Sequence, residues 1–157
     1  MINYYKIKLV VNVIKGVEMT KKLVLIIDAK FAKLYNAEGL KIRSLISKYT
    51  PDEFDIVHKK QSLRTGFKKQ TSGAAHFFDP HTEAKDIERS EFSKKISEII
   101  KNKVNGSNFS ELIIIAAPKM LNLMRKHLFK FIKIEVKEVA KDLIHATESQ
   151  IAKVAFS

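Results

Sequence analysis

The apolar run Leu112–Ala117 is the clearest structural signal in the sequence. β-Branched residues dominate it and polar residues do not alternate with them, which is typical of a strand covered on both faces. Apolar residues then recur at helical spacing from Met120 to Leu128, just after Pro118, a residue type that is tolerated in the first turn of a helix. A buried strand that leads into a helix predicts an α/β domain.

Three strands are predicted ahead of this unit. Leu23–Ile27 is rich in β-branched residues, Phe31–Tyr35 follows it closely, and Leu40–Ser47 shows an imperfect alternation. Asn36–Gly39 has the composition of a hairpin turn, since Gly39 can adopt a positive φ. We expect these strands to pair as an antiparallel meander.

A long helix is predicted to begin near Asp79 and to run to about Val104. Asp79 or Thr82 can cap it, with Pro80 in the first turn, and Gly106 can end it. Its apolar residues recur as one stripe that we expect to be buried, namely Ala84, Ile87, Phe92, Ile96, Ile99 and Ile100.

Two elements complete the pattern. Phe131–Val139 alternates apolar and charged residues as a half-buried strand does, and Thr147 can cap a last helix, Glu148–Phe156. The resulting order is β-β-β-α-β-α-β-α, with a long loop, Tyr49–Phe78, after the third strand. This is the order of the ribonuclease H-like fold, so we predict an α/β domain with a mixed central sheet flanked by helices. An analogy of fold carries no function by itself.

Length and composition fit one globular domain. The chain has 157 residues, 45% of them hydrophobic, and no cysteine, which excludes disulfides and thiolate sites. No apolar run approaches the roughly 18 residues that a membrane span needs, and we predict a cytoplasmic protein. Residues 1–18 are predicted to be an N-terminal extension, because Met19 precedes the first secure strand; an additional edge strand, Tyr5–Ile14, is the alternative. The single domain is then residues 19–157.

The net charge is strongly positive. Lysine and arginine number 29 against 17 acids, which gives +12. Such an excess favours RNA, DNA or anionic lipid as a partner, or else reflects a lysine-rich solvated surface. Two windows, Lys59–Lys69 and Lys119–Lys133, contain no acid. We expect Phe129 and Phe131 to belong to the core. Phe67, in the long loop, is a candidate for stacking on a base, with a place in the core as the alternative. The residues predicted to bind nucleic acid are Lys59, Lys60, Arg64, Phe67, Lys68, Lys69, Arg125 and Lys126.

The residue pattern gives little support to a metal-dependent nuclease. On this fold, such an enzyme needs carboxylates from the first strand, the long helix and the fourth strand. Asp28 could supply the first and Asp86, Glu88 or Glu91 the second, but Leu112–Ala117 has no acid. Asp28 is therefore predicted to be a turn residue.

Other catalytic and metal patterns are also absent from the sequence. His76, Asp79 and His81 match no zinc spacing. The chain has no nucleophile elbow, P-loop or dinucleotide-binding fingerprint. We therefore predict no cofactor and favour a role other than catalysis.

Several segments together resemble the bacterial host-attachment protein family. They are Ser72–His76 with Asp79–Thr82, the strand–helix unit Leu112–Leu128, and Val139–Leu143, and the match extends from about Met19 to the C-terminus. The family name implies a role in the attachment of bacteria to host cells. The residues that carry the resemblance are Asp28, Gly73, His76, Asp79, His81, Thr82, Pro118, Lys141 and Asp142.

This family is similar, at a distance, to the middle domain of archaeal and eukaryotic peptide-release factors. In that domain a Gly-Gly-Gln loop before the long helix enters the peptidyl-transferase centre of the ribosome. The corresponding loop here, about Arg64–Phe78, has Gly66, Gln70 and Gly73 but no Gly-Gly-Gln. The resemblance thus implies association with the ribosome, tRNA or other structured RNA without peptide release. Attachment to host cells and a tRNA-directed hydrolase or nuclease are the alternatives.

Overall fold

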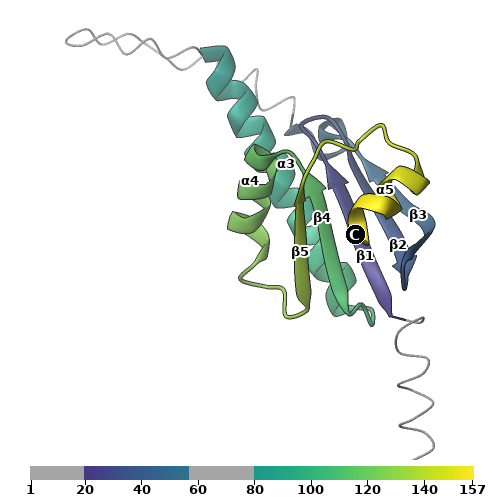
Figure 1. Cartoon of the computed structure of the whole chain (residues 1–157). Coiled ribbons are helices and arrows are strands. Elements are labelled where there is room, and N and C mark those ends of the chain that lie inside the picture. Colours follow the sequence, from purple (N-terminus) through teal and green to yellow (C-terminus); the bar gives the residue numbers. More distant parts are fainter. Residues whose placement is uncertain (1–19, 57–79) are drawn as a thin grey trace, which may run out of the picture.

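The computed structural model describes residues 20–56 and 80–157, with Pro80 and His81 described by their backbone alone. The predicted extension, residues 1–18, and most of the predicted long loop lie outside these ranges. In chain order the elements are β1 (Lys21–Ile27), β2 (Ala32–Glu38), β3 (Lys41–Tyr49), the 3-10 helix η1 (Pro51–Phe54), α3 (Pro80–Asn105), β4 (Glu111–Ala116), α4 (Pro118–Leu128), β5 (Glu135–Ala140) and α5 (Glu148–Ala155) (Figure 1).

The five strands form one mixed sheet in the order β3-β2-β1-β4-β5. β1 is antiparallel to β2, and β2 to β3, whereas β4 is parallel to both β1 and β5. This is the predicted meander followed by two parallel strands. The prediction of a mixed α/β sheet flanked by helices is confirmed.

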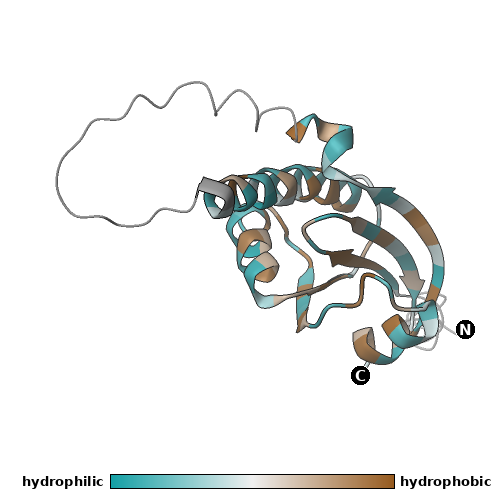
Figure 2. Cartoon of the chain, turned by 90° about the horizontal axis from the view of Figure 1, so that it is seen from above, coloured by the Kyte–Doolittle hydropathy of each residue, from teal (hydrophilic) through white to brown (hydrophobic). Residues whose placement is uncertain are grey.

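Both faces of the sheet are covered, which explains the unbroken apolar runs. Leu23, Leu25 and Ile27 of β1 belong to the core under α3 and α4, whereas Val24 and Ile26 belong to the core under α5. Each of these side chains is at most 2% exposed. Figure 2 shows the strands between α3 and α4 on one side and α5 on the other.

The long helix α3 buries one stripe, as predicted, but a shorter one. Phe92, Ile96, Ile100 and Val104 recur every four residues and are buried. The prediction that Ile87 is buried is wrong, because its side chain is 49% exposed. The physical reason is that the first turns of α3 extend beyond the end of the sheet, away from the strands (Figure 1).

The turn between β2 and β3 is tighter than predicted. β2 continues to Glu38, because Ala37 is fully buried in the core under α5. The turn is formed by Gly39 and Leu40, and Gly39 has a φ of 59°, which fits the expected role of this glycine. Leu40 is 68% exposed and lies outside β3.

β3 forms one edge of the sheet of described strands. Its pairing with β2 shifts in register twice, next to Tyr35 and next to Ala37. Such shifts mark β-bulges, which interrupt the strict in-and-out alternation of side chains. This explains the imperfect alternation of the sequence here and the exposure of Leu45 and Ile46.

Thr147 caps α5, as predicted. Its Oγ1 accepts a hydrogen bond from the backbone N–H of Gln150 at 3.3 Å, and its own N–H donates to Oε1 of Gln150 at 2.9 Å. This reciprocal capping box satisfies two N–H groups at the start of the helix. It fixes the only helix that covers the second face of the sheet in the described part of the chain.

Candidate nucleic-acid interface

Asp28 lies at the carboxyl end of β1, where a nuclease of this fold would need a ligand. Its Oδ1 accepts hydrogen bonds from the backbone N–H groups of Lys30 at 2.7 Å and Phe31 at 2.6 Å. The carboxylate therefore closes the turn between β1 and β2, as predicted. Among the described residues, no group of three or more His, Asp or Glu side chains could hold a metal ion.

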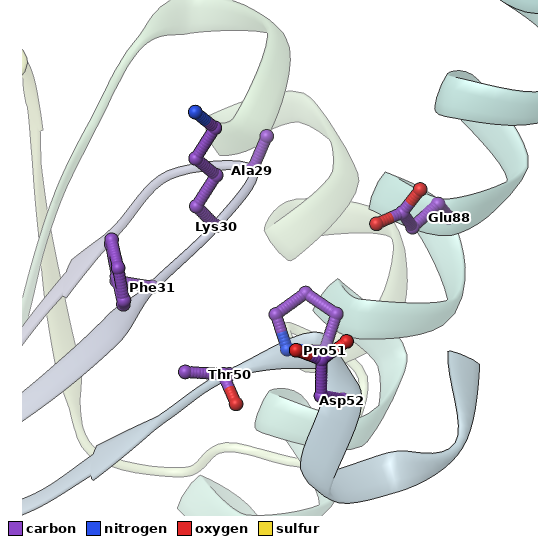
Figure 3. Close-up of a pocket in the computed structure, with 7 residues that line it drawn as sticks. All are labelled: Ala29, Lys30, Phe31, Thr50, Pro51, Asp52 and Glu88. Atoms are coloured by element: carbon purple, nitrogen blue, oxygen red, sulfur yellow. The ribbon is translucent and has the colours of Figure 1, made fainter. Parts of the chain in front are cut away.

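A cavity of about 260 Å³ opens beside this turn (Figure 3). Glu88 reaches toward it from α3, opposite the residues that follow β1. The lining combines one ammonium group with two carboxyl groups, so its net charge is negative and does not favour a phosphate. The residues that line it are Ala29, Lys30, Phe31, Thr50, Pro51, Asp52 and Glu88.

Lys119, in the second acid-free window, is engaged with α3. Its Nζ lies 2.7 Å from Oδ1 of Asp86, and Nη1 of Arg89 lies 2.9 Å from the same oxygen. The hydrogen bond from Lys119, more than the one from Arg89, holds the pKa of Asp86 below its ordinary value. This network joins the first turn of α4 to α3.

Arg125, predicted to bind phosphate, contacts a carboxylate. Its Nε lies 2.8 Å from both carboxylate oxygens of Glu138 on β5, and its Nη2 contacts Oε2 of the same residue. Its Nη1 donates to Asn122 at 3.0 Å. The hydrogen bonds to Glu138 raise the pKa of the guanidinium group further. Arg125 thus connects α4 to β5, and its role in binding stays a prediction.

A group of lysines lies where the C-terminal half of α4 packs beside α3. The positive charges of Lys94 and Lys126 both lower the pKa of His127. Nζ of Lys101 lies 4.1 Å from the ring centroid of Phe131. Within the described ranges these lysines form no ion pair. We call this surface the cationic ridge; it consists of Lys94, Lys101, Lys126, Lys130 and Lys133 with Phe129 and Phe131.

The prediction that Phe129 and Phe131 belong to the core is wrong. Their side chains are 43% and 51% exposed. α4 ends at Leu128, which is fully buried and occupies the core position. The strand predicted from Phe131 begins only at Glu135, so both rings lie on the connection between α4 and β5.

His127 lies within the ridge and is partly covered. Burial, and then the positive charges of Lys126 and Lys94, lower its pKa, against the opposing effect of Glu91. Its Nε2 is buried and has no hydrogen-bond partner in the described part of the structure. The imidazole is therefore kept neutral beside ammonium groups.

The ridge includes two residues on α3 that the sequence reasoning missed. Lys94 and Lys101 are seven residues apart, a spacing that places them on one face of a helix. This spacing, within a helix that was itself predicted, is the signal that could have identified them. The acid-free windows did not include them because Glu98 lies between them.

The remaining motif residues that the structure describes serve local structure. Pro118 begins α4, and Oδ1 of Asp142 accepts a hydrogen bond from the N–H of Ile144 at 3.3 Å. Lys141 is exposed, and Thr82 lies in the first turn of α3. The predicted residues Lys59, Lys60, Arg64, Phe67, Lys68, Lys69, Gly73, His76 and Asp79 lie outside the described residues, as does the side chain of His81.

A family model described as "Protein required for attachment to host cells" matches residues 23–154. The chain belongs to this host-attachment family. The resemblance predicted from the sequence motifs is thereby confirmed. This member of the host-attachment family is 34% identical to "Uncharacterized protein RP470" of Rickettsia prowazekii (strain Madrid E). That match extends over 143 residues, 87% of this chain and 93% of the other.

Solved structures of two archaeal proteins resemble this family member at low identity. Archaeoglobus fulgidus Pelota is 10% identical with a TM-score of 0.42, and the match covers 96% of this chain and 36% of that one. The archaeal translation termination factor aRF1 is 13% identical with a TM-score of 0.41, over 85% of this chain and 37% of that one. The family member thus spans about a third of these proteins. Similarity this low carries no functional information.

None of the described helices of this family member is long and apolar enough to cross a membrane.

Proposed function

We propose that this chain is a cytoplasmic RNA-binding protein that associates with the ribosome or tRNA and does not release peptides. The observation that carries the proposal is the cationic ridge. In a protein of net charge +12, five lysines gather on one surface without a carboxylate partner in the described ranges. Clustered ammonium groups bind phosphates by displacing condensed counterions. Lys59, Lys60, Arg64, Lys68 and Lys69 are proposed to add phosphate contacts.

Several lysines elsewhere have defined structural partners. Nζ of Lys22 lies 3.1 Å from Glu111, and Nζ of Lys33 donates to the carbonyl oxygen of Ile144 at 2.5 Å. Nζ of Lys137 donates to two carbonyl oxygens near the end of the chain, both at 2.9 Å. The ridge lysines differ from these because none of them forms an ion pair with a carboxylate in the described ranges, although Lys101 contacts the ring of Phe131. This contrast supports a ligand rather than a purely structural role.

Salt-dependent binding of labelled tRNA tests the proposal. The variant K126Q/K130Q/K133Q should weaken binding and reduce the slope of log K against log salt by about two to three units, since each lost phosphate contact removes about one. The matched control K21Q/K41Q/K153Q removes the same charge from exposed lysines outside the ridge. Equal weakening by both variants would show that only net charge matters and would refute a ridge-based site.

Ribosome association requires a separate measurement. In a cell lysate at low salt, the protein should sediment with ribosomal fractions and return to the top of a sucrose gradient at high salt. A protein that stays at the top at low salt, with no nucleic acid bound after purification, would contradict the proposal. Incubation with labelled tRNA and Mg²⁺ in the same preparation tests for hydrolysis.

The description of the family favours a second candidate, a factor in the attachment of bacteria to host cells. A direct role of this kind requires the chain to be at the cell surface. Protease treatment of intact cells distinguishes the two candidates. Degradation of the protein in intact cells would support attachment, whereas complete protection together with bound RNA would support the first proposal.

A further inference from the structure

We propose that the cationic ridge binds unpaired nucleotides, with bases stacked on Phe129 and Phe131 and phosphates held by the neighbouring lysines. The inference rests on the proposed RNA binding and specifies the chemical class of its ligand. It distinguishes single strands, loops and bulges from continuous helical RNA.

The two rings are held in place on an ordered turn. The N–H of Phe131 donates to the carbonyl oxygen of Leu128 at 3.0 Å, and the N–H of Phe129 donates to that of Arg125 at 3.4 Å. Leu128, which directly precedes Phe129, is fully buried and fixes the start of the turn to the core. The backbone that carries the exposed rings is therefore already ordered before a base stacks on them, which lowers the entropy cost of binding.

The cations are placed where a stacked nucleotide would need them. Nζ of Lys101 lies 4.1 Å from the ring centroid of Phe131, a cation–π contact that covers one face of the ring, so a base would stack on the opposite face. Lys130 lies between the two phenylalanines in sequence, and Lys126 and Lys133 flank them. Aromatic rings beside a groove or ridge of cations are the usual arrangement for binding unpaired bases.

Helical RNA does not offer the same contacts. Its bases already stack on one another, so their faces are covered except at helix ends. The lysines can contact the phosphates of either form, but the rings can contact only the unpaired one. The two phenylalanines should therefore determine the preference for unpaired RNA, and the lysines the total affinity.

Two other classes of partner fit the ridge less well. Insertion of Phe131 into a lipid bilayer would draw the ammonium group of Lys101 toward the hydrocarbon, which carries a large desolvation cost. The core of a protein–protein interface is depleted of lysine, whereas the ridge that carries these rings includes five lysines. The charge and the aromatic rings together favour RNA.

Fluorescence provides a direct readout of stacking, because the chain has no tryptophan. The variant F131W introduces a single indole on the ridge, and L40W introduces one at an exposed position outside it. A single-stranded RNA of roughly 12 nucleotides, within the site sizes known for such surfaces, should quench F131W on binding and leave L40W unchanged. A blunt duplex of equal length should quench neither.

Affinity provides the second readout. The variant F129L/F131L keeps apolar side chains but removes both rings, and L40A/L45A is the matched control at exposed apolar positions. We expect F129L/F131L to weaken single-strand binding about tenfold or more and duplex binding less than twofold. The control should change neither, and melting curves should show that all variants fold.

The outcomes separate this inference from the proposed function. If both RNAs bind equally, the lysine variants weaken both, and F131W is not quenched, then RNA binding stands and base stacking is refuted. If neither RNA binds, both proposals fail. Binding to vesicles of anionic lipid without binding to RNA would refute both and would identify the ridge as a membrane-surface site.

Discussion

Arg125 of α4 and Glu138 of β5 form a forked ion pair in which Nε lies 2.8 Å from both carboxylate oxygens. The pair neutralises a guanidinium group that lies next to Lys126 of the cationic ridge. Glu138→Gln removes the negative charge but keeps a side chain of nearly equal size. Because Arg125 then becomes available to phosphate, we expect tighter RNA binding and an increase of the salt slope by about one unit.

A matched control for this prediction is Glu38→Gln, which removes a carboxylate of β2 that pairs with Arg43 of β3, outside the ridge. It should leave the salt slope unchanged. A slope unaffected by Glu138→Gln, with the fold intact by circular dichroism, would show that Arg125 does not reach the RNA. The melting temperature should fall only slightly, because ion pairs between exposed side chains contribute little to stability.

His127 should make stability depend on pH. Its pKa is lowered in the folded state, chiefly by burial and also by Lys126 and Lys94, from an ordinary value of 6.5. Below pH 6.5, His127 therefore binds a proton more readily in the unfolded chain than in the folded chain. As a consequence, the free energy of unfolding falls as the pH decreases through the lowered folded pKa. His127→Gln should remove this contribution, so the variant should gain stability relative to the original protein below pH 6.5.

Thermal melts of both proteins between about pH 8 and pH 5 measure this difference, since histidine titrates in that range. Above pH 6.5 the two curves should be parallel. If the difference in melting temperature is independent of pH, then His127 titrates normally in the folded state. Bound phosphate should favour protonated His127, so RNA affinity should rise as the pH falls in the original protein but less in the variant.

Leu128 should be the residue on which the ridge depends for its shape. It is fully buried at the end of α4 and precedes Phe129. Leu128→Ala should cost about 3 kcal/mol in the free energy of unfolding, because it leaves a cavity in the core. Urea titration measures this cost. Leu123→Ala, on the same helix but only partly buried, should cost less; an equal cost would contradict the anchoring role of Leu128.

Asp28 should act on stability and not on catalysis. Asp28→Ala removes both hydrogen bonds to the turn and should cost about 1 kcal/mol. Asp28→Asn retains an oxygen acceptor and should cost less. Thermal melts with and without Mg²⁺ test the assignment. Stabilisation of the original protein by Mg²⁺ that Asp28→Asn abolishes would instead indicate a metal ligand.

The elements that are buried on both faces could be predicted from the sequence. Leu112–Ala116 has no polar residue, and the structure buries every side chain in it. Phe131 could not be placed in this way, because the residues directly after it, from Ile132 to Lys137, alternate with the period of a strand. Leu128 occupies the core at the end of α4, whereas Phe131 is exposed. Which of these two residues is buried is decided in the folded structure.

The number of lysines and arginines in the site could be predicted from the sequence. Which of them are free of ion pairs, and so available to a phosphate, could not. Lys119 pairs with Asp86, which is 33 residues away, and Arg125 pairs with Glu138, which is 13 residues away. A segment without acids can therefore still be partly neutralised by acids from other elements. Lys126 keeps its charge exposed in the described structure because no carboxylate of α3 or β5 forms an ion pair with it.

The two register shifts between β2 and β3 have a consequence for the behaviour of the protein at high concentration. A flat edge strand with exposed apolar residues, such as Leu45 and Ile46, can act as a template for chain-to-chain aggregation. Bulges twist the edge and break the regular ladder that an incoming strand would need. A chain that carries many positive charges and an irregular edge should therefore remain dispersed during folding, despite the apolar side chains exposed along that strand.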